Sequence, residues 1–456
     1  MHTTDPWSAP YADGPVSGTV RVPGSKSLTN RYLVLAALAT GGGHSTIHHP
    51  LVSRDTSLMR AALEQFGLTF ESTDDDATWT IHTPGALRSG FAIDAGLAGT
   101  VMRFLPPVAA LANGWITFDG DAAARTRPIG PLVHALRDLG IRVDSTDTTG
   151  IDPDTTTHPD TATDTDTDTS RAAQPHLPLA VHGTGAVSRA EVTIDASTSS
   201  QFVSALLLAG ARFEHGLRLR HRGANLPSRP HIDMTLRTLR QVGVRAHEPE
   251  PGLWSVEAGP IAPLNVTVEP DLSSAAPFLA LAAVTGGTIT VPDWPATTTQ
   301  AGDTMRSVLS AMGARVEVHA SALTITGPPR GTLRGIDIDL HDVGELTPVI
   351  AAVAAHACTP SRLRGVAHLR GHETDRLQAL HTELSRMGGD VAQREDGLAI
   401  TPSALRPASV QTYHDHRMAM AGAVLGVGVR GTTVVDINTT SKTYPGFADA
   451  WSELVR

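Results

Sequence analysis

A pattern of helix, glycine and strand recurs along this chain and restricts the folds that it can adopt. Its glycines are Gly67, Gly140, Gly243, Gly313 and Gly388, each preceded by an amphipathic stretch and followed by a short alternating run. They lie roughly 70 residues apart, except for one interval of roughly 100 residues that contains an Asp/Thr-rich tract. Glycine suits the left-handed turn after a helix, and alternating apolar residues indicate a strand. Each repeat therefore predicts a helix, a turn and a strand.

A second helix is predicted in each repeat, and it is far more apolar than the first. Segments such as residues 33–39 and 349–355 contain only Ala, Leu, Val and Ile, so these helices should be buried. Each opens at a small or acidic residue, which is either an ordinary helix cap or part of a shared anion site. The predicted starts lie near Ser27, Gly99, Ser199, Ser273, Glu345 and Asp415. Six such units divide naturally into two α/β domains of three units each.

Length and composition agree with a soluble protein of two domains. The chain has 456 residues, more than one hydrophobic core usually supports, of which 41% are hydrophobic and 18% charged. It has no apolar run of transmembrane length, and its first residues lack the pattern of a secretory signal, so we expect a cytoplasmic protein without membrane contact. The single cysteine, Cys358, cannot form an internal disulfide and is expected to be buried in an apolar helix.

The distribution of charge argues against several classes of ligand. The net charge is -10, and much of the acidity lies in residues 145–171, which we expect to be a disordered insertion; an acidic metal-binding tract is the alternative. Aromatic residues are only 4%, so no nucleic-acid partner is expected. The glycine-rich fingerprints of nucleotide and dinucleotide sites are absent, so the sequence implies neither ATP nor NAD as a ligand.

His414 and His416 form the best local pair for zinc, but no further ligand spacing supports a zinc site, and we expect neither metal nor cofactor.

Cationic residues cluster where the buried helices are predicted to begin. A solvated surface pair would explain Lys26 and Arg31 if they stood alone. Guanidinium forks and helix N-termini from both halves of the chain instead indicate small molecules with several negative charges, and two such molecules fit better than one polyanion. The cations concerned are Lys26, Arg31, Arg103, Arg127, Arg376, Arg417 and Lys442.

Taken together, these clusters resemble the 5-enolpyruvylshikimate-3-phosphate (EPSP) synthase family, the 3-phosphoshikimate 1-carboxyvinyltransferases. The matching segments include Pro-Gly-Ser-Lys-Ser at 23–27, Ala-Gly-Thr at 98–100 with Arg103, Arg-Pro-Ile-Gly at 127–130, Ser-Ser-Gln at 199–201, Glu-Thr-Asp-Arg at 373–376, Asp-His-Arg-Met-Ala-Met at 415–420 and Ser-Lys-Thr at 441–443. The resemblance spans almost the whole chain. It implies the enolpyruvyl transferase fold, with three βαβαββ units around a pseudo-threefold axis in each of two domains that close over the substrates.

The resemblance also implies a division of the chain and a reaction. We expect a discontinuous domain of residues 1–23 plus 269–456, which carries the phosphoenolpyruvate-side cations, and a second domain of residues 24–268 on the side of shikimate 3-phosphate. The implied reaction transfers the enolpyruvyl group of phosphoenolpyruvate to the 5-hydroxyl of shikimate 3-phosphate and releases phosphate, through a tetrahedral intermediate. It belongs to the shikimate pathway, which leads to chorismate and the aromatic amino acids, and the enzyme is expected to be a monomer.

Particular residues are implied for each substrate. The contacts of shikimate 3-phosphate would be Lys26, Ser27, Arg31, Ser199, Ser200, Gln201, Ser228, Glu345 and His372. The contacts of phosphoenolpyruvate would be Lys26, Gly99, Arg127, Gln201, Arg376, Arg417 and Lys442, with Arg103 supporting the Gly99 loop. Glu345 would take the hydroxyl proton as the base, and Glu373 with Lys26 would move the proton at C3 of phosphoenolpyruvate. These three residues are the predicted catalytic set.

The chain departs from the commonest pattern of the family at five positions. Leu97 stands where Asn is frequent, His231 where Tyr is frequent, and His368 and His372 where Asn and Lys are frequent, while Glu345 replaces an Asp. Because histidine titrates near neutral pH, we expect the affinity for shikimate 3-phosphate to fall as the pH rises past the imidazole pKa of His372.

Three alternative functions remain to be weighed. A sister enolpyruvyl transferase acts on UDP-N-acetylglucosamine and typically has a reactive Cys in a mobile loop, but residues 121–127 contain none. A non-catalytic binding protein would keep the cations and lose the acid and base, whereas Lys26, Glu345 and Glu373 are all present. A paralogue that serves a specialised pathway remains compatible with these residues.

Overall fold

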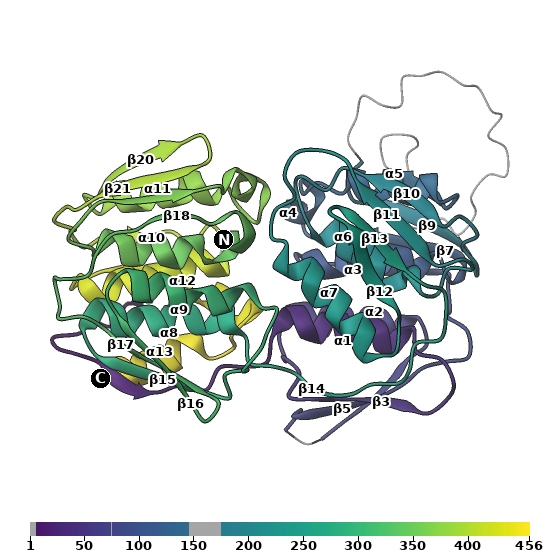
Figure 1. The fold of residues 1–456 in the computed structure, drawn as a ribbon, viewed down its shortest axis with the longest axis horizontal. Coiled ribbons are helices and arrows are strands. Elements are labelled where there is room, and N and C mark those ends of the chain that lie inside the picture. The colour runs from purple at the N-terminus through teal and green to yellow at the C-terminus, as the bar shows by residue number, and fades with distance from the viewer. Residues whose placement is uncertain (1–5, 74, 146–174) are drawn as a thin grey trace.

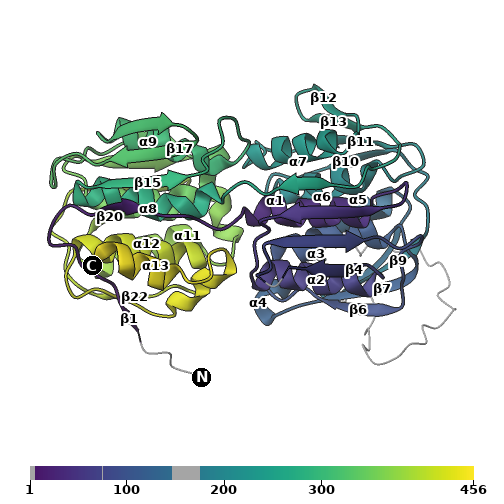
Figure 2. The same ribbon diagram turned by 90° about the horizontal axis from the view of Figure 1, so that it is seen from below.

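The fold consists of two lobes that lie side by side (Figure 1). The computed structural model describes residues 6–73, 75–145 and 175–456. One apolar core is built from side chains between Leu28 and Val268, and a second from residues 9–20 together with residues 272–451. The chain therefore passes between the lobes twice, and Figure 2 shows the purple N-terminal segment running along the second lobe before it enters the first at helix α1. The expected insertion, apart from Ser145, lies outside the described residues.

The first lobe contains three units, each with the order β-α-β-α-β-β. The first unit comprises β14 (Asn265–Thr267), α1 (Lys26–Ala37), β3 (His44–His48), α2 (Arg54–Gln65), β4 (Thr69–Ser72) and β5 (Thr78–His82). The second comprises β6 (Phe91–Asp94), α3 (Gly99–Ala109), β7 (Asn113–Asp119), α4 (Ala122–Arg125), α5 (Gly130–Asp138), β8 (Arg142–Ser145) and β9 (Leu179–Thr184). The third comprises β10 (Glu191–Ile194), α6 (Gln201–Gly210), β11 (Leu217–His221), α7 (Pro230–Gln241), β12 (Ala246–Glu250) and β13 (Leu253–Val256).

The second lobe repeats this plan with short 3-10 helices added before some helices. Its first unit comprises β2 (Ser17–Thr19), α8 (Leu272–Thr285), β15 (Thr288–Pro292), η1 (Ala301–Thr304), α9 (Met305–Ala311), β16 (Arg315–His319) and β17 (Ala322–Thr326). The next comprises β18 (Asp337–Asp339), η2 (His341–Leu346), α10 (Thr347–Ala355), β19 (Ser361–Arg364), η3 (Ala367–Gly371), α11 (Arg376–Arg386), β20 (Asp390–Arg394) and β21 (Gly397–Thr401). The last comprises β22 (Ser409–Val410), α12 (His416–Gly428), β23 (Thr433–Val434), η4 (Ile437–Lys442), α13 (Phe447–Val455) and β1 (Trp7–Ser8).

Each unit forms its own small mixed sheet. Five sheets have four strands in equivalent orders: β14-β3-β5-β4, β6-β7-β9-β8, β10-β11-β13-β12, β2-β15-β17-β16 and β18-β19-β21-β20. In each, the first two strands are parallel and the remaining pairs antiparallel, as a βαβ crossover followed by a hairpin requires. The sixth sheet, β22-β23-β1, has the same pattern with three strands. Strands β14 and β2 reach their sheets from distant parts of the sequence, and so tie the two crossings in place.

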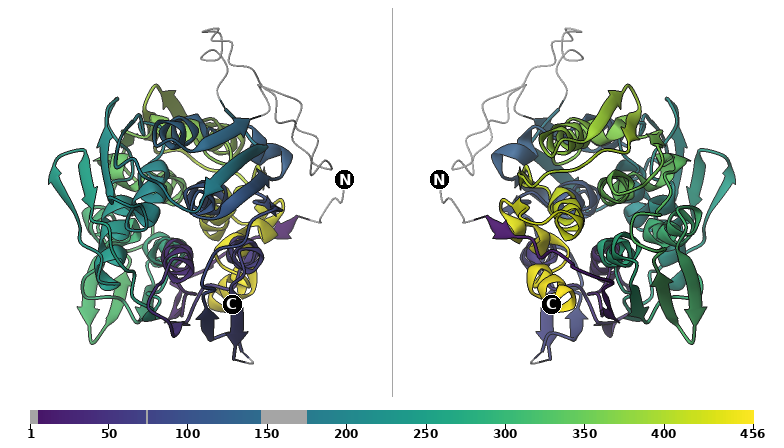
Figure 3. Two further views of the ribbon diagram at one scale, coloured as in Figure 1. Left: turned by 90° about the vertical axis from the view of Figure 1, so that its right-hand side faces the viewer. Right: turned by 90° about the vertical axis from the view of Figure 1, so that its left-hand side faces the viewer.

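The apolar helices occupy the middle of each lobe, as their composition predicts. Helices α1, α3 and α6 pack against one another in the first lobe, and α8, α10 and α12 do so in the second. Every residue from Leu272 to Thr285 of α8 is buried. Figure 3 looks along the long axis and shows the strands at the periphery and the helices toward the middle. The predicted enolpyruvyl transferase architecture of two α/β lobes with three units each is therefore confirmed.

The glycines of the repeat also behave as predicted. Gly67, Gly140, Gly243, Gly313 and Gly388 have φ angles of 101°, 87°, 82°, 111° and 80°, in the left-handed region that glycine adopts without strain. Each lies just beyond the amphipathic helix of its unit, where such a residue ends the helix. Among the described residues, no helix is long and apolar enough to cross a membrane.

Candidate active site

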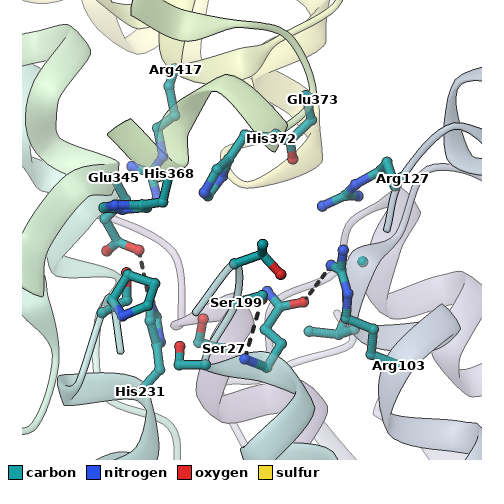
Figure 4. Close-up of a pocket in the computed structure, with 18 of the residues that line it drawn as sticks. Ser27, Arg103, Arg127, Ser199, His231, Glu345, His368, His372, Glu373 and Arg417 are labelled. Carbon is teal, nitrogen blue, oxygen red and sulfur yellow. Dashed lines mark hydrogen bonds and ion pairs between the residues drawn. The ribbon is translucent and has the colours of Figure 1, made fainter. Parts of the chain in front are cut away.

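A cavity of about 120 Å³ lies between the two lobes (Figure 4). Its walls come from the starts of α1, α3, α6 and α12, from η2 and from the loop before α11. Among the predicted site residues, the following line it: Lys26, Ser27, Gly99, Arg103, Arg127, Ser199, Ser200, Gln201, Ser228, Glu345, His372, Glu373, Arg376, Arg417 and Lys442. Residues that are up to about 400 positions apart in sequence thus meet in one place, as the clustering of cations at helix starts predicts.

The helix N-termini make this cavity electropositive even without the contribution of the cationic side chains. Lys26, Gly99 and Gln201 are the first residues of α1, α3 and α6, and Arg417 is the second residue of α12. The first four N–H groups of a helix lack intrahelical partners, and the helix dipole adds about half a positive charge at this end. Four such ends face a single cavity, which favours ligands with several negative charges.

Three of the cationic side chains that line the cavity are held by buried carboxylates. Lys26 Nζ lies 3.1 Å from Asp55 Oδ2. Arg376 Nε lies 2.7 Å from Asp415 Oδ2, and both of these side chains are almost completely buried. These ion pairs fix the positions of the cations in the cavity wall, so that little ordering is required when a ligand binds.

Arg127 and Arg417 have no such carboxylate partner in the described ranges and point into the cavity. Among the described residues, no carboxylate forms an ion pair with Arg127 or Arg417, and Nε of Arg127 is buried without a hydrogen-bond acceptor. The only acceptor for the Arg127 guanidinium within the described part of the chain is the carbonyl oxygen of Leu97, 3.2 Å from Nη1. Figure 4 shows Arg127 and Arg417 reaching toward the cavity from opposite lobes. Their remaining donors are free to bind a carboxylate or a phosphate group.

Glu345 is the acidic residue best placed to accept a proton. It lies in η2 directly before α10, and its Oε2 atom is 3.0 Å from His231 Nε2. Burial alone would raise the pKa of the Glu345 carboxyl, but His231, Arg417 and the Ser273 hydroxyl together hold this pKa well below its usual range. The carboxylate is therefore ionised at neutral pH and is available as a base.

Glu373 and Lys26 lie on the other side of the cavity. Glu373 Oε1 is 2.8 Å from Lys442 Nζ, and its Oε2 is 3.0 Å from Arg376 Nη2. Burial opposes ionisation, yet Lys442, Arg376 and Arg127 keep the pKa of Glu373 well below the ordinary value. Burial, with a contribution from Lys442, lowers the pKa of Lys26 and so makes its ammonium group a better proton donor.

His372 and His368 are uncharged at neutral pH, because their pKa values are lowered, and this corrects one expectation. Burial first, and then the charge of Arg376, hold the pKa of His372 well below its ordinary value. The geometry agrees, because Arg376 Nη1 lies 3.4 Å from His372 Nδ1 and can only donate, so this nitrogen must be an acceptor. Burial lowers the pKa of His368 to about 4 in the same way. Because its pKa is this low, His372 does not titrate near neutral pH as expected.

Hydroxyl and amide groups line the first-lobe side of the cavity. Gln201 Oε1 accepts a hydrogen bond of 2.8 Å from Arg103 Nη1, which orients the amide at the start of α6. Ser228 has a φ angle of 56°, unusual for a residue other than glycine, and its N–H donates to the carbonyl oxygen of His341 at 3.2 Å. Ser27, Ser199 and Ser200 complete a row of neutral donors and acceptors suited to hydroxyl and phosphate oxygens.

Arg31 is predicted to touch substrate, but it lies beneath the cavity and does not line it. Its side chain is buried, with 1% exposure. Its guanidinium donates to Thr235 Oγ1 at 2.8 Å and to the carbonyl oxygens of Ser27 and His231, both at 2.9 Å. Arg31 therefore supports two residues of the cavity wall, Ser27 and His231, from below.

Comparison with known proteins agrees with this arrangement. Residues 10–172 and 167–451 match the family described as EPSP synthase (3-phosphoshikimate 1-carboxyvinyltransferase). The 3-phosphoshikimate 1-carboxyvinyltransferase of Kocuria rhizophila is 52% identical over 460 residues, covering 99% of this chain and 97% of the relative. The chain belongs to the EPSP synthase family. The enzyme of the same name from Mycobacterium ulcerans is 49% identical over 461 residues, covering 100% of this chain and 99% of the relative.

Solved structures confirm the EPSP synthase fold. The EPSP synthase of Acinetobacter baumannii superposes with a TM-score of 0.76 at 23% identity and covers 99% of this chain and 98% of its own. The enolpyruvyl transferase NikO from Streptomyces tendae shares the fold with a TM-score of 0.69 at 16% identity, covering 98% of this chain and 96% of its own. As a member of the EPSP synthase family, the chain is an enzyme that transfers a carboxyvinyl (enolpyruvyl) group to 3-phosphoshikimate, a step of the shikimate pathway, as the resemblance predicts.

Two further residues, Asp55 and Ser273, bind predicted members of this EPSP synthase site. Asp55 binds Lys26 and lies 4.0 Å from Lys442, although in sequence it reads only as an acidic residue at the start of an amphipathic helix. Ser273 binds Glu345 through its hydroxyl group. The only signal for Ser273 was its place at a predicted helix start, equivalent to that of Ser27.

One prediction outside the site is wrong. Cys358 is exposed, not buried, because helix α10 ends at Ala355 and the cysteine follows in the loop before β19. No group of His, Cys, Asp and Glu suited to a metal ion is found among the described residues.

Proposed function

We propose that phosphoenolpyruvate and shikimate 3-phosphate bind together in the cavity between the lobes. The observation that carries this proposal is that the unpaired guanidinium groups of Arg127 and Arg417 and four helix N-termini surround the same space as Glu345. The proposed contacts of phosphoenolpyruvate are Lys26, Gly99, Arg127, Gln201, Arg376, Arg417 and Lys442. Those of shikimate 3-phosphate are Lys26, Ser27, Ser199, Ser200, Gln201, Ser228, Glu345 and His372, with Arg31 supporting Ser27 from beneath.

The proton transfers are assigned to Glu345, Lys26 and Glu373. In the addition step the 5-hydroxyl oxygen bonds to C2 of phosphoenolpyruvate, the hydroxyl proton goes to Glu345, and C3 receives a proton from the ammonium group of Lys26, beside the ionised Glu373. In the elimination step C3 returns a proton to the same pair, the bond from C2 to the phosphate oxygen breaks, and phosphate leaves with that electron pair. The lowered pKa of Glu345 keeps it ionised and so able to accept a proton, and the lowered pKa of Lys26 makes it a better proton donor.

The cations have a second task in this scheme. Negative charge shifts from the enol phosphate toward the leaving phosphate during the reaction, and preorganised donors stabilise such a charge without reorganising. Removal of one donor of this kind typically raises the barrier by about 3–4 kcal/mol. Arg127 and Arg417 have the free N–H donors for this task.

We also propose that the chain divides into a discontinuous domain of residues 1–23 plus 269–456 and a domain of residues 24–268, and that it acts as a monomer in the cytoplasm. The boundary is supported by the two separate cores, because the first ends at Val268 and the second resumes at Leu272. The proposed contacts of both substrates all lie in a single copy of the chain, so the proposed site requires no residue from a second subunit. Light scattering coupled to gel filtration tests this point, with a mass near 47.9 kDa expected.

The assay for this function measures released phosphate. The purified protein is incubated with phosphoenolpyruvate and either shikimate 3-phosphate or UDP-N-acetylglucosamine as acceptor. We expect phosphate only with shikimate 3-phosphate, and with it an equal amount of the enolpyruvyl ether. Phosphate release only with UDP-N-acetylglucosamine would overturn the assignment of the acceptor, and release with neither would overturn the proposed function.

A further inference from the structure

The two oxygens of the Glu345 carboxylate are held by residues of different lobes. The hydroxyl of Ser273, in the first turn of α8, binds Oε1 from within the second lobe. His231 Nε2 lies 3.0 Å from Oε2 and belongs to α7 of the first lobe. Figure 4 shows the ring of His231 directed at the Glu345 carboxylate. One of the two contacts therefore exists only while the lobes are together.

His231 is rigidly placed within its own lobe. It is the second residue of α7, directly after Pro230, whose fixed φ angle suits the first turn of a helix. Its carbonyl oxygen accepts hydrogen bonds from Arg31 Nη2 at 2.9 Å and from Thr235 Oγ1 at 3.0 Å. Because Arg31 and Thr235 are buried, the imidazole is presented from a supported backbone.

The chain before His231 is also joined to η2, the element that carries Glu345. The N–H of Ser228 donates to the carbonyl oxygen of His341 at 3.2 Å, and His341 Nε2 lies 3.0 Å from the carbonyl oxygen of Leu226. The N–H of Arg229 lies 3.4 Å from Asp342 Oδ1. Hydrogen bonds therefore join segment 226–231 to η2 across the lobe interface, and the His231–Glu345 hydrogen bond is one of them.

The charges around Glu345 give this contact a chemical consequence. His231 from α7 and Arg417 from α12 are the neighbours that most favour the ionised carboxylate, and Ser273 adds a hydrogen bond. Arg31 from α1 and Arg376 from α11 also interact electrostatically with Glu345. Burial raises the pKa of Glu345. Of the groups that lower this pKa, His231 contributes most, and it belongs to the opposite lobe.

We propose that His231 is a positioning residue that orients the Glu345 carboxylate across the lobe interface, so that the catalytic base is completed only when the lobes close. This inference rests on the proposed function. With the lobes apart, Glu345 keeps Ser273 and loses His231, so it is left less well oriented and more readily protonated. Closure then assembles the base around bound shikimate 3-phosphate and links substrate enclosure to proton removal.

The test compares three variants by phosphate release. His231→Phe keeps a ring of similar size without a donor, and we expect kcat to fall roughly 10- to 100-fold while both KM values change less than about threefold. The acid limb of its kcat profile should move to higher pH, because Glu345 loses the group that most favours its ionised form. His231→Gln keeps an N–H donor and should recover most of kcat. If His231→Phe does not fold, His231→Asn, which is too short to reach Glu345, replaces it with the same expected loss.

Arg237→Gln is the matched control. Arg237 is also on α7, and its Nη1 donates to the carbonyl oxygen of Thr297 across the interface at 3.3 Å without touching Glu345. We expect it to keep kcat and the acid limb. A His231→Phe enzyme with the kcat and acid limb of the wild type would overturn the inference, as would equal losses in His231→Phe and Arg237→Gln. A wild-type protein that releases no phosphate would instead refute the proposed function.

Discussion

The Nζ atom of Lys442 lies 2.8 Å from Oε1 of Glu373, within a cavity that otherwise concentrates positive charge. Lys442 ends η4 and Glu373 precedes α11, so this ion pair joins two units of the second lobe. The other oxygen of Glu373 accepts from Arg376. A carboxylate is thus kept ionised in the cavity wall, at the place where a proton must reach C3 of phosphoenolpyruvate in the proposed mechanism.

Glu373→Gln should lower kcat roughly 100-fold or more, because the amide keeps the shape but cannot carry a proton. The KM for shikimate 3-phosphate should change little. Steady-state phosphate release measures both constants. Glu317→Gln, at an exposed position on β16 where Glu317 pairs with Arg315, is the control and should be unaffected. A Glu373→Gln enzyme with wild-type turnover would remove Glu373 from the mechanism.

Arg417→Gln should lower kcat/KM for phosphoenolpyruvate roughly 100-fold or more, since it removes a charged donor that points into the cavity and forms no ion pair within the described part of the chain. Arg417→Lys should restore only part of the loss, because an ammonium group cannot make the bidentate contact. Arg315→Gln is the exposed control in the same lobe. If binding of shikimate 3-phosphate, measured by calorimetry, suffers as much as that of phosphoenolpyruvate, Arg417 has been assigned to the wrong substrate.

His372 should not titrate near neutrality in the free enzyme. Because its pKa lies well below the ordinary value, the imidazole stays uncharged from about pH 6 to pH 8.5, and no affinity that depends on its charge is lost over this window. The ratio of kcat/KM for shikimate 3-phosphate between the wild type and His372→Asn should therefore be constant over this range. A ratio that falls as the pH rises from 6 to 7 would show that His372 is charged when substrate binds.

Gly99→Ala should weaken phosphoenolpyruvate binding selectively. A Cβ atom at Gly99 would lie 3.0 Å from both Arg103 Nη1 and Arg127 Nη2, so both guanidinium groups would have to shift. We expect the KM for phosphoenolpyruvate to rise roughly 10-fold, with a smaller change for shikimate 3-phosphate. Gly259→Ala adds a methyl group with nothing within 4 Å and should change neither constant. Equal KM values in Gly99→Ala and the wild type would contradict the tight fit.

Much of the fold follows from local patterns in the sequence. The left-handed glycines and the apolar helices repeat with one period, so the six units could be predicted. Cys358 shows the limit of such patterns. The Ala-rich stretch predicts a helix through Cys358, whereas the helix ends at Ala355, ahead of Thr359 and Pro360, a pair that disfavours helical backbone.

The sequence indicates which residues gather in the site, but not which of them contact each other. Cations at helix starts could be placed together, because buried helices of one lobe share a direction. The contacts of Lys26 with Asp55 and of Glu345 with His231 depend on how separate elements face each other, which no local pattern encodes. The burial of His372 beside Arg376 is of the same kind, and it reversed the expected charge of that histidine.

The central claim is that the two substrates bind side by side between the lobes, and a crystal structure of Glu345→Gln with both of them tests it most directly. We predict that shikimate 3-phosphate lies against Ser27, Ser199 and Ser200, and that the anionic groups of phosphoenolpyruvate lie within hydrogen-bond distance of Arg127 and Arg417. Phosphoenolpyruvate bound elsewhere on the molecule, with neither arginine in contact, would contradict the account.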